Sequence, residues 1–188
     1  KILIVTHQYL PHVSPRTTRW KLLVDELITN GHNVSILTGM YPDFDTNNVE
    51  VLYFGNKNNI NIVSNLREKS KQITSGDSIK KLFYGVLKKV YRFFINYLAW
   101  PDYSMFWLYQ VYKNRNKISK DYDIIISVSL PFSSHIAAYV INKKVKKHWI
   151  MDIGDPFSLK VDAPENNRFF YSGLNLSLIH ISEPTRQH

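Results

Sequence analysis

Residues 1–38 read KILIVTHQYLPHVSPRTTRWKLLVDELITNGHNVSILT. An apolar run over 1–6 has the length and composition of a strand that is buried on both faces. Ser14, followed by proline, is a typical N-cap, so a helix is predicted over 15–29. A second strand, rich in Val and Ile, is predicted over 33–38. A strand, a helix and a second strand in this order predict a right-handed crossover and therefore a parallel sheet.

The rest of the chain continues this alternation. Three more apolar stretches have strand character, three segments have helical character, and a polar stretch over 55–78 is expected to be a long loop. The fold class predicted from this order is α/β, with a Rossmann-like parallel sheet flanked by helices. The further strands are predicted over 49–54, 123–129 and 148–153, and the further helices over 79–99, 104–118 and 131–143.

Apolar residues spaced three and four apart predict the buried faces of two helices. The predicted buried residues are Trp20, Leu23, Val24 and Leu27 in the first helix, and Ile136, Tyr139 and Val140 in the helix over 131–143.

Composition excludes several classes of protein. The 188 residues include no cysteine, which excludes a disulfide scaffold, a thiolate zinc site and a cysteine nucleophile. A formal net charge of +9 favours a polyanionic partner, although a soluble, lysine-rich protein is the plain alternative. The chain has no dinucleotide-binding glycine fingerprint, Walker A loop, calcium loop or zinc-binding helix motif.

Ligands of open α/β sheets bind beyond the carboxyl ends of the strands. The first loop in that position leads into the helix over 15–29, whose N-terminus favours anions. Ser14, Arg16 and Arg19 are therefore candidate substrate-binding residues, the arginines for phosphate. The alternative is a capped surface helix with solvated arginines.

A second loop follows the strand over 123–129 and opens another helix. Ser129, Ser133, Ser134 and His135 are candidate substrate-binding residues because their side chains can bind a sugar hydroxyl or a phosphate. Helix capping by the serines and a structural histidine remain the alternatives.

The third loop carries two carboxylates, Asp152 and Asp155, after a buried strand. A partly desolvated carboxylate there can act as a general base for a hydroxyl nucleophile, so both are candidate catalytic residues. Asp155 is the first choice because Pro156 restricts the backbone next to it. The alternative is that one aspartate caps a helix and the other pairs with a basic residue. The chain shows no metal-ligand pattern.

Residues 80–98, KKLFYGVLKKVYRFFINYL, interleave basic and apolar side chains. Such a helix is typical of a surface that lies on anionic membranes. An ordinary helix packed on the sheet is the alternative. The aromatic stretch over 93–112 is long enough for a membrane span, but Asn96 and Asp102 favour two helices that meet. The candidate membrane contacts are Lys80, Lys81, Lys88, Lys89 and Arg92.

The end of the chain has a different character. Residues 176–186, LSLIHISEPTR, match the translation of a sequencing adapter, so 176–188 are expected to be a non-native tail. The native chain is then expected to be a gene fragment, with one domain over 1–175 that is incomplete at its C-terminal end.

Three segments together resemble the N-terminal domain of glycosyltransferase family 4, in particular bacterial members that build O-antigen or capsule. They are ILIVTHQYLPHVSPRTTRW over 2–20, DYDIIISVSLPFSSHIAAYVI over 121–141 and WIMDIGDPF over 149–157. The resemblance implies the acceptor-side half of a GT-B fold and a retaining transferase without a metal or other cofactor. The donor-binding domain, with its pair of glutamates, has no counterpart in this chain.

The resemblance also implies partners and a location. The donor is a nucleotide sugar bound by the missing domain, and the acceptor is a saccharide, expected to be lipid-linked. The enzyme is expected to be cytoplasmic and peripheral on the inner face of the cytoplasmic membrane, with no nucleic-acid partner. Ser129 stands where some relatives have a histidine, so no catalytic histidine is transferred. A Rossmann-like nucleotide- or nucleic-acid-binding module and a non-catalytic membrane scaffold remain alternative functions.

Overall fold

A computed structural model of the chain describes residues 1–40, 49–55, 78–98, 101–129 and 131–154. Five parallel strands form one sheet in the order β3-β2-β1-β4-β5, which confirms the predicted Rossmann-like α/β fold. The strands are β1 (Ile2–Val5), β2 (Val34–Thr38), β3 (Glu50–Tyr53), β4 (Ile124–Val128) and β5 (His148–Asp152).

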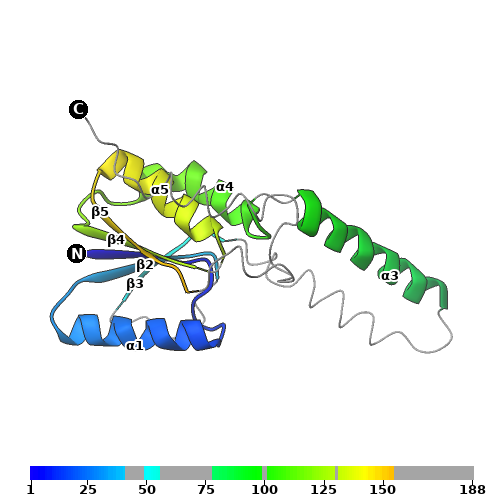
Figure 1. Cartoon of the computed structure of the whole chain (residues 1–188), viewed down its shortest axis with the longest axis horizontal. Helices are drawn as coiled ribbons and strands as arrows, with labels where there is room; N and C mark the ends of the chain where they lie inside the picture. The colour runs from blue at the N-terminus through cyan, green and yellow to red at the C-terminus, as the bar shows by residue number, and fades with distance from the viewer. Residues whose placement is uncertain (41–48, 56–77, 99–100, 130, 155–188) are drawn as a thin grey trace.

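Helices cover both faces of the sheet. Figure 1 shows α1 below the sheet, α4 and α5 above it, and α3 extending away from both layers. The helices are α1 (Pro15–Thr29), α3 (Ser78–Phe93), α4 (Met105–Asn114) and α5 (Ser133–Val145). A π-helical segment η2 (Phe94–Leu98) continues α3, and a 3-10 segment η3 (Arg115–Lys117) continues α4.

The central strand β1 divides its side chains between two hydrophobic cores. Ile2 and Ile4 pack with residues of α1, whereas Leu3 and Val5 pack with residues of α4 and α5. This division follows from the pleat of a strand, which directs successive side chains to opposite faces. All four side chains are buried, as expected for a central strand of a parallel sheet.

Helix α1 begins and ends where the sequence predicts. Ser14 caps its N-terminus, and Gly31, just beyond its C-terminus, takes a positive φ of 83° that favours glycine. Trp20 and Val24 are buried as predicted, but Leu23 is exposed, so its assignment to the buried face was wrong. The buried face of α1 is therefore narrower than the spacing of its apolar residues predicts.

The predicted buried face of α5 was also wrong. Tyr139 is exposed, and Ile136 and Val140 are only partly buried. Small and polar residues face inward instead, because α5 lies close to the sheet and its polar residues have internal hydrogen-bond partners. The buried residues are Ser133, Ser134, His135, Ala137, Ala138 and Ile141.

The aromatic stretch over 93–112 is divided between separate helices, as predicted, because α3 and its continuation η2 end at Leu98 and α4 begins at Met105. Within the described residues, no helix has the length and apolar character needed to cross a membrane. Apart from Gly55 and Ser78, the predicted loop over 55–78 lies outside the described residues, as does the tail over 176–188.

Candidate functional site

The order of the strands marks a position for ligand binding. Strand β1 lies between β2 and β4, and the helices that follow β1 and β4 cover opposite faces of the sheet. The order of the chain reverses between β1 and β4, and ligands of open α/β sheets bind at the carboxyl edge of such a switch point. The loops that leave β1, β4 and β5 all begin at this edge, as the sequence predicts.

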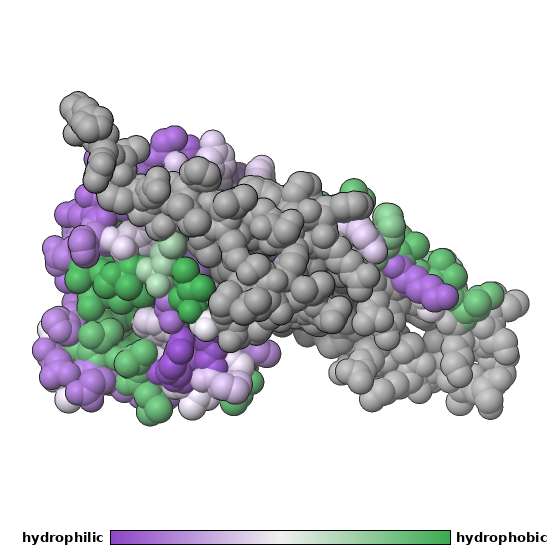
Figure 2. All heavy atoms as spheres, in the orientation of Figure 1, coloured by the Kyte–Doolittle hydropathy of each residue, from purple (hydrophilic) through white to green (hydrophobic). Residues whose placement is uncertain are grey.

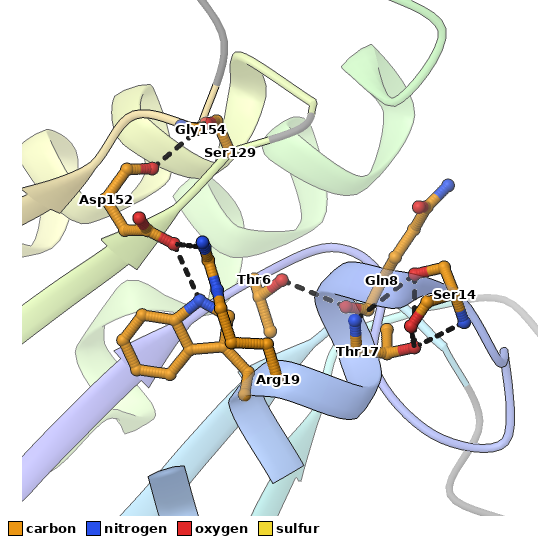
Figure 3. A network of polar contacts seen from close by, with 9 residues as sticks. Thr6, Gln8, Ser14, Thr17, Arg19, Ser129, Asp152 and Gly154 are labelled. Atoms are coloured by element: carbon orange, nitrogen blue, oxygen red, sulfur yellow. Dashed lines mark hydrogen bonds and ion pairs between the residues drawn. The ribbon is translucent and has the colours of Figure 1, made fainter. Parts of the chain in front are cut away.

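Asp152, the last residue of β5, connects the sheet to α1 at this edge. Its carboxylate accepts a hydrogen bond from Trp20 Nε1 at 2.7 Å and forms an ion pair with Arg19 (Figure 3). The Asp152 side chain is 24% exposed, and that of Arg19 is 50% exposed. The alternative in which one aspartate pairs with a basic residue is therefore confirmed for Asp152.

Ser129 fixes the segment that follows β5. Its hydroxyl donates to the backbone carbonyl of Asp152 at 2.9 Å and accepts from the Gly154 N–H at 3.2 Å. Ser129 is buried, and Figure 3 shows it beside Asp152 and Gly154. The residue therefore holds the start of the loop that carries Asp155, while Asp155 itself lies outside the described residues.

The N-terminus of α1 is closed by a capping box. The Ser14 hydroxyl accepts from the Thr17 N–H at 3.2 Å, and the Thr17 hydroxyl accepts from the Ser14 N–H at 2.7 Å. The same Thr17 hydroxyl donates to the carbonyl of His12. Ser14 thus has the capping role that the sequence predicts, and Arg16 lies partly buried in the first turn.

Asp102 is a buried carboxylate whose role the sequence did not reveal. It accepts from the N–H and hydroxyl of Ser104 at 2.9 and 2.6 Å, and from the N–H and hydroxyl of Ser133 at 2.9 and 2.8 Å. It thereby joins the beginnings of α4 and α5, and burial raises its pKa. The sequence feature that could have indicated this role is the position of Asp102, two residues before Ser104 at the start of a predicted helix.

His7, directly after β1, is a second residue that sequence reasoning passed over. Its backbone N–H donates to Ser134 Oγ at 3.1 Å, and its ring makes edge contacts with Tyr103 and Trp107. Among the described residues, no group bonds to its buried Nδ1 atom, and burial lowers its pKa to about 4. A Cβ at Gly39 would lie 2.5 Å from the ring, so glycine is needed there.

His135, in the first turn of α5, is buried against β4 and does not reach the surface. Its Nδ1 atom is 2.8 Å from Ser127 Oγ, which also accepts from Trp149 Nε1 at 2.9 Å. Burial lowers the pKa of His135 to about 4. Together with Ser133 and Ser134, it is fully buried, so in this conformation these three candidates stabilise the fold from inside.

The structure therefore brings Arg19, Ser129 and Asp152 together, whereas Ser133, Ser134 and His135 are buried inside the fold. In the described part of the chain, no group of three or more His, Asp or Glu residues could hold a metal ion. Of the candidate membrane contacts, Lys89 is exposed on α3, and the side chains of the other four lie outside what is described.

No family model, curated protein or solved structure matches this chain.

The buried histidines predict a loss of stability in mild acid. Because the pKa of His135 falls from 6.5 to about 4 on folding, only the unfolded chain takes up this proton between those pH values. Stability from the neutral ring is complete above pH 6.5 and is lost as the pH falls towards 4, where the loss reaches about 3 kcal/mol. We expect His135→Asn to be less stable than the unmodified chain at pH 7. Its free energy of unfolding, measured with urea at pH 7, 6 and 5, should however decrease less as the pH falls.

The exposed His32 supplies the control for this measurement. His32→Asn should keep the pH dependence of the unmodified chain. A His135→Asn variant with the same pH dependence would show that His135 is not the group that is protonated.

Proposed function

We propose that this chain is the acceptor-side half of a retaining glycosyltransferase of the GT-B type. It would position a saccharide acceptor while a separate domain binds the nucleotide sugar. The proposal rests on the three motif segments and is supported by one observation above all. The loops that carry those motifs begin at one edge of the sheet, where Arg19, Ser129 and Asp152 are in contact.

The ion pair between Arg19 and Asp152 suits this chemistry. A donor diphosphate carries more negative charge than a carboxylate and matches the planar fork of an arginine. Arg19 is half-exposed, so a diphosphate that approaches from the second domain can replace Asp152 as its partner. The exchange would place positive charge on the leaving phosphate and leave Asp152 beside the acceptor.

Asp155 is proposed to orient the attacking hydroxyl of the acceptor. In a retaining transfer the leaving phosphate can itself take the proton, so the carboxylate needs only to hold the hydroxyl in position. The bonds from Ser129 to Asp152 and Gly154 fix the backbone up to the residue before Asp155. Because basic side chains and helix N-termini stabilise the leaving phosphate, this function needs no metal ion.

The proposed location is the inner face of the cytoplasmic membrane, where a lipid-linked acceptor is held in the bilayer and the nucleotide sugar is dissolved in the cytoplasm. The net charge of +9 favours such a surface, because the inner leaflet is anionic.

We expect the chain to bind a lipid-linked saccharide in detergent micelles but to release no nucleotide from any of a panel of nucleotide sugars. Transfer needs both halves of a GT-B enzyme, so turnover should appear only when a donor-binding domain is present. Titration calorimetry and a nucleotide-release assay measure the two properties. Tight binding of a free nucleotide or nucleic acid by this chain would favour a nucleotide-binding module instead, and transfer by this chain alone would refute the division into halves.

A further inference from the structure

Helix α3 exposes a continuous set of large apolar side chains. Leu82 and Phe83 are 70% and 63% exposed, and the apolar residues of the next three turns are exposed as well. Figure 2 shows hydrophobic surface along this helix, next to hydrophilic side chains. The exposed apolar residues of α3 are Leu82, Phe83, Val86, Leu87, Val90 and Phe93.

These residues form one face of the helix. At 100° per residue they occupy one side of α3. The sequence positions of Lys81, Lys88 and Arg92 fall on the opposite side, and those of Lys80 and Lys89 fall at the two borders of the apolar face. Residues 78–98 contain five Lys and Arg residues and no Asp or Glu. Helix α3 is therefore apolar along one side and positively charged along the other.

The apolar face of α3 is not turned to the sheet. The helix extends away from the layers of the domain, and among the described elements its main contact is with its own continuation η2 (Figure 1). The alternative in which this helix packs its apolar stripe on the sheet was therefore wrong. An apolar face of this extent that is exposed to solvent marks a site for binding a protein partner or a membrane.

We propose that the apolar face of α3 inserts into the interface of an anionic lipid bilayer, with the helix axis in the plane of the membrane. The apolar side chains would enter the boundary between headgroups and acyl chains, and the lysines would contact anionic headgroups. Five Lys and Arg residues lie within α3, and charged side chains are costly inside the hydrocarbon, so the helix lies on the membrane and does not cross it.

Charge favours a lipid surface over a second copy of the chain as the occupant. Two copies would each carry +9, and α3 offers no acidic residue to a basic partner. An anionic bilayer complements every charge on the helix and accepts its apolar face at the same time. The inference deepens the proposed function, on which it rests, because it names the surface by which the transferase reaches a lipid-linked acceptor.

The decisive experiment compares two matched pairs of substitutions in the full chain. Leu82→Gln with Phe83→Gln removes part of the apolar face of α3. Leu22→Gln with Leu23→Gln is the control, because these residues are adjacent, 64% and 44% exposed, and lie on α1. Sedimentation with vesicles of phosphatidylglycerol and phosphatidylethanolamine measures binding, and phosphatidylcholine vesicles report the need for negative charge.

We expect the unmodified chain to bind the anionic vesicles, to bind phosphatidylcholine weakly, and to lose affinity as salt is raised. The α3 pair should weaken binding about tenfold or more, because two large apolar side chains no longer enter the interface. The α1 pair should bind like the unmodified chain. Replacing Lys80, Lys81, Lys88 and Lys89 with Gln should remove the preference for anionic lipid.

A fluorescent reporter tests insertion in an otherwise unmodified chain. The sequence has no cysteine, so Leu82→Cys and Leu22→Cys each provide a single labelling site. An environment-sensitive dye at position 82 should brighten and shift to the blue when anionic vesicles are added, while the dye at position 22 should not change.

Equal binding by the α3 pair and the unmodified chain, or no change of the dye at position 82, would overturn the proposal. So would a dimer in sedimentation velocity that the α3 pair abolishes, because the face would then bind protein. The assay involves no sugar transfer. Vesicle binding without transferase activity in the complete enzyme would therefore refute the proposed function alone, and activity without α3-dependent binding would refute this inference alone.

Discussion

Asp102→Ala is expected to lower the free energy of unfolding by about 2–4 kcal/mol. The carboxylate accepts two backbone N–H groups, those of Ser104 and Ser133, and both residues are buried. Without it, neither group gains water, and each buried donor left without a partner costs about 1–3 kcal/mol. The Phe132 N-cap of α5 makes no side-chain capping bond, so Asp102 is the acceptor at this helix start.

Urea unfolding monitored by tryptophan fluorescence measures this effect. Asp25→Ala is the matched control, because Asp25 is an exposed aspartate paired with Lys21 one turn away, a contact that contributes about 0.5 kcal/mol or less. If the Asp102 and Asp25 variants were equally stable, the carboxylate would not be what joins α4 to α5.

Asp155→Asn is expected to reduce kcat/KM of the complete transferase by a factor of about 10²–10⁴, the range typical of a residue that positions or moves the reacting proton. The amide keeps the size of the side chain but removes its charge, so the fold should be unchanged. Steady-state kinetics with a saccharide acceptor and a thermal unfolding curve separate the two effects.

Asp152→Asn is the comparison that separates chemistry from structure. This variant loses the ion pair with Arg19 and weakens the acceptor for Trp20 Nε1, so its Tm should fall as well as its activity. If Asp155→Asn retained near-normal turnover, or if both variants lowered Tm equally, the proposed role of Asp155 would be wrong.

The parts of the fold that depend on residues close together in the chain could be predicted from the sequence. The bounds of α1 follow from the Ser14 cap, the proline after it and Gly31, all of which act within one turn. The strands follow from short apolar runs. The parallel arrangement of β1 with β2, and of β4 with β5, follows from the helix between the two strands of each pair. The position of the three loops at one edge of the sheet then follows from the topology.

The contacts that could not be predicted join distant parts of the chain. Asp102 and Ser133 are 31 residues apart, and Arg19 and Asp152 are 133 apart. The first pair explains why the inward face of α5 was misassigned. Periodicity cannot distinguish an exposed serine from a buried serine that is bonded to a carboxylate of another loop. The exposure of the apolar face of α3 also could not be predicted, because it depends on which other elements α3 packs against.

The composition of β1 has a consequence for how this protein can evolve. Both cores receive aliphatic side chains of similar size from β1, so a shift of the strand by one residue would still bury apolar groups on both sides. The end of the strand distinguishes the two alignments, because the ring of His7 packs so closely on Gly39 that a Cβ there would lie 2.5 Å from it. Residues at the candidate site thus also hold the central strand in place. New specificity is therefore more accessible through the loops beyond the strand ends than through replacements at His7 or Gly39.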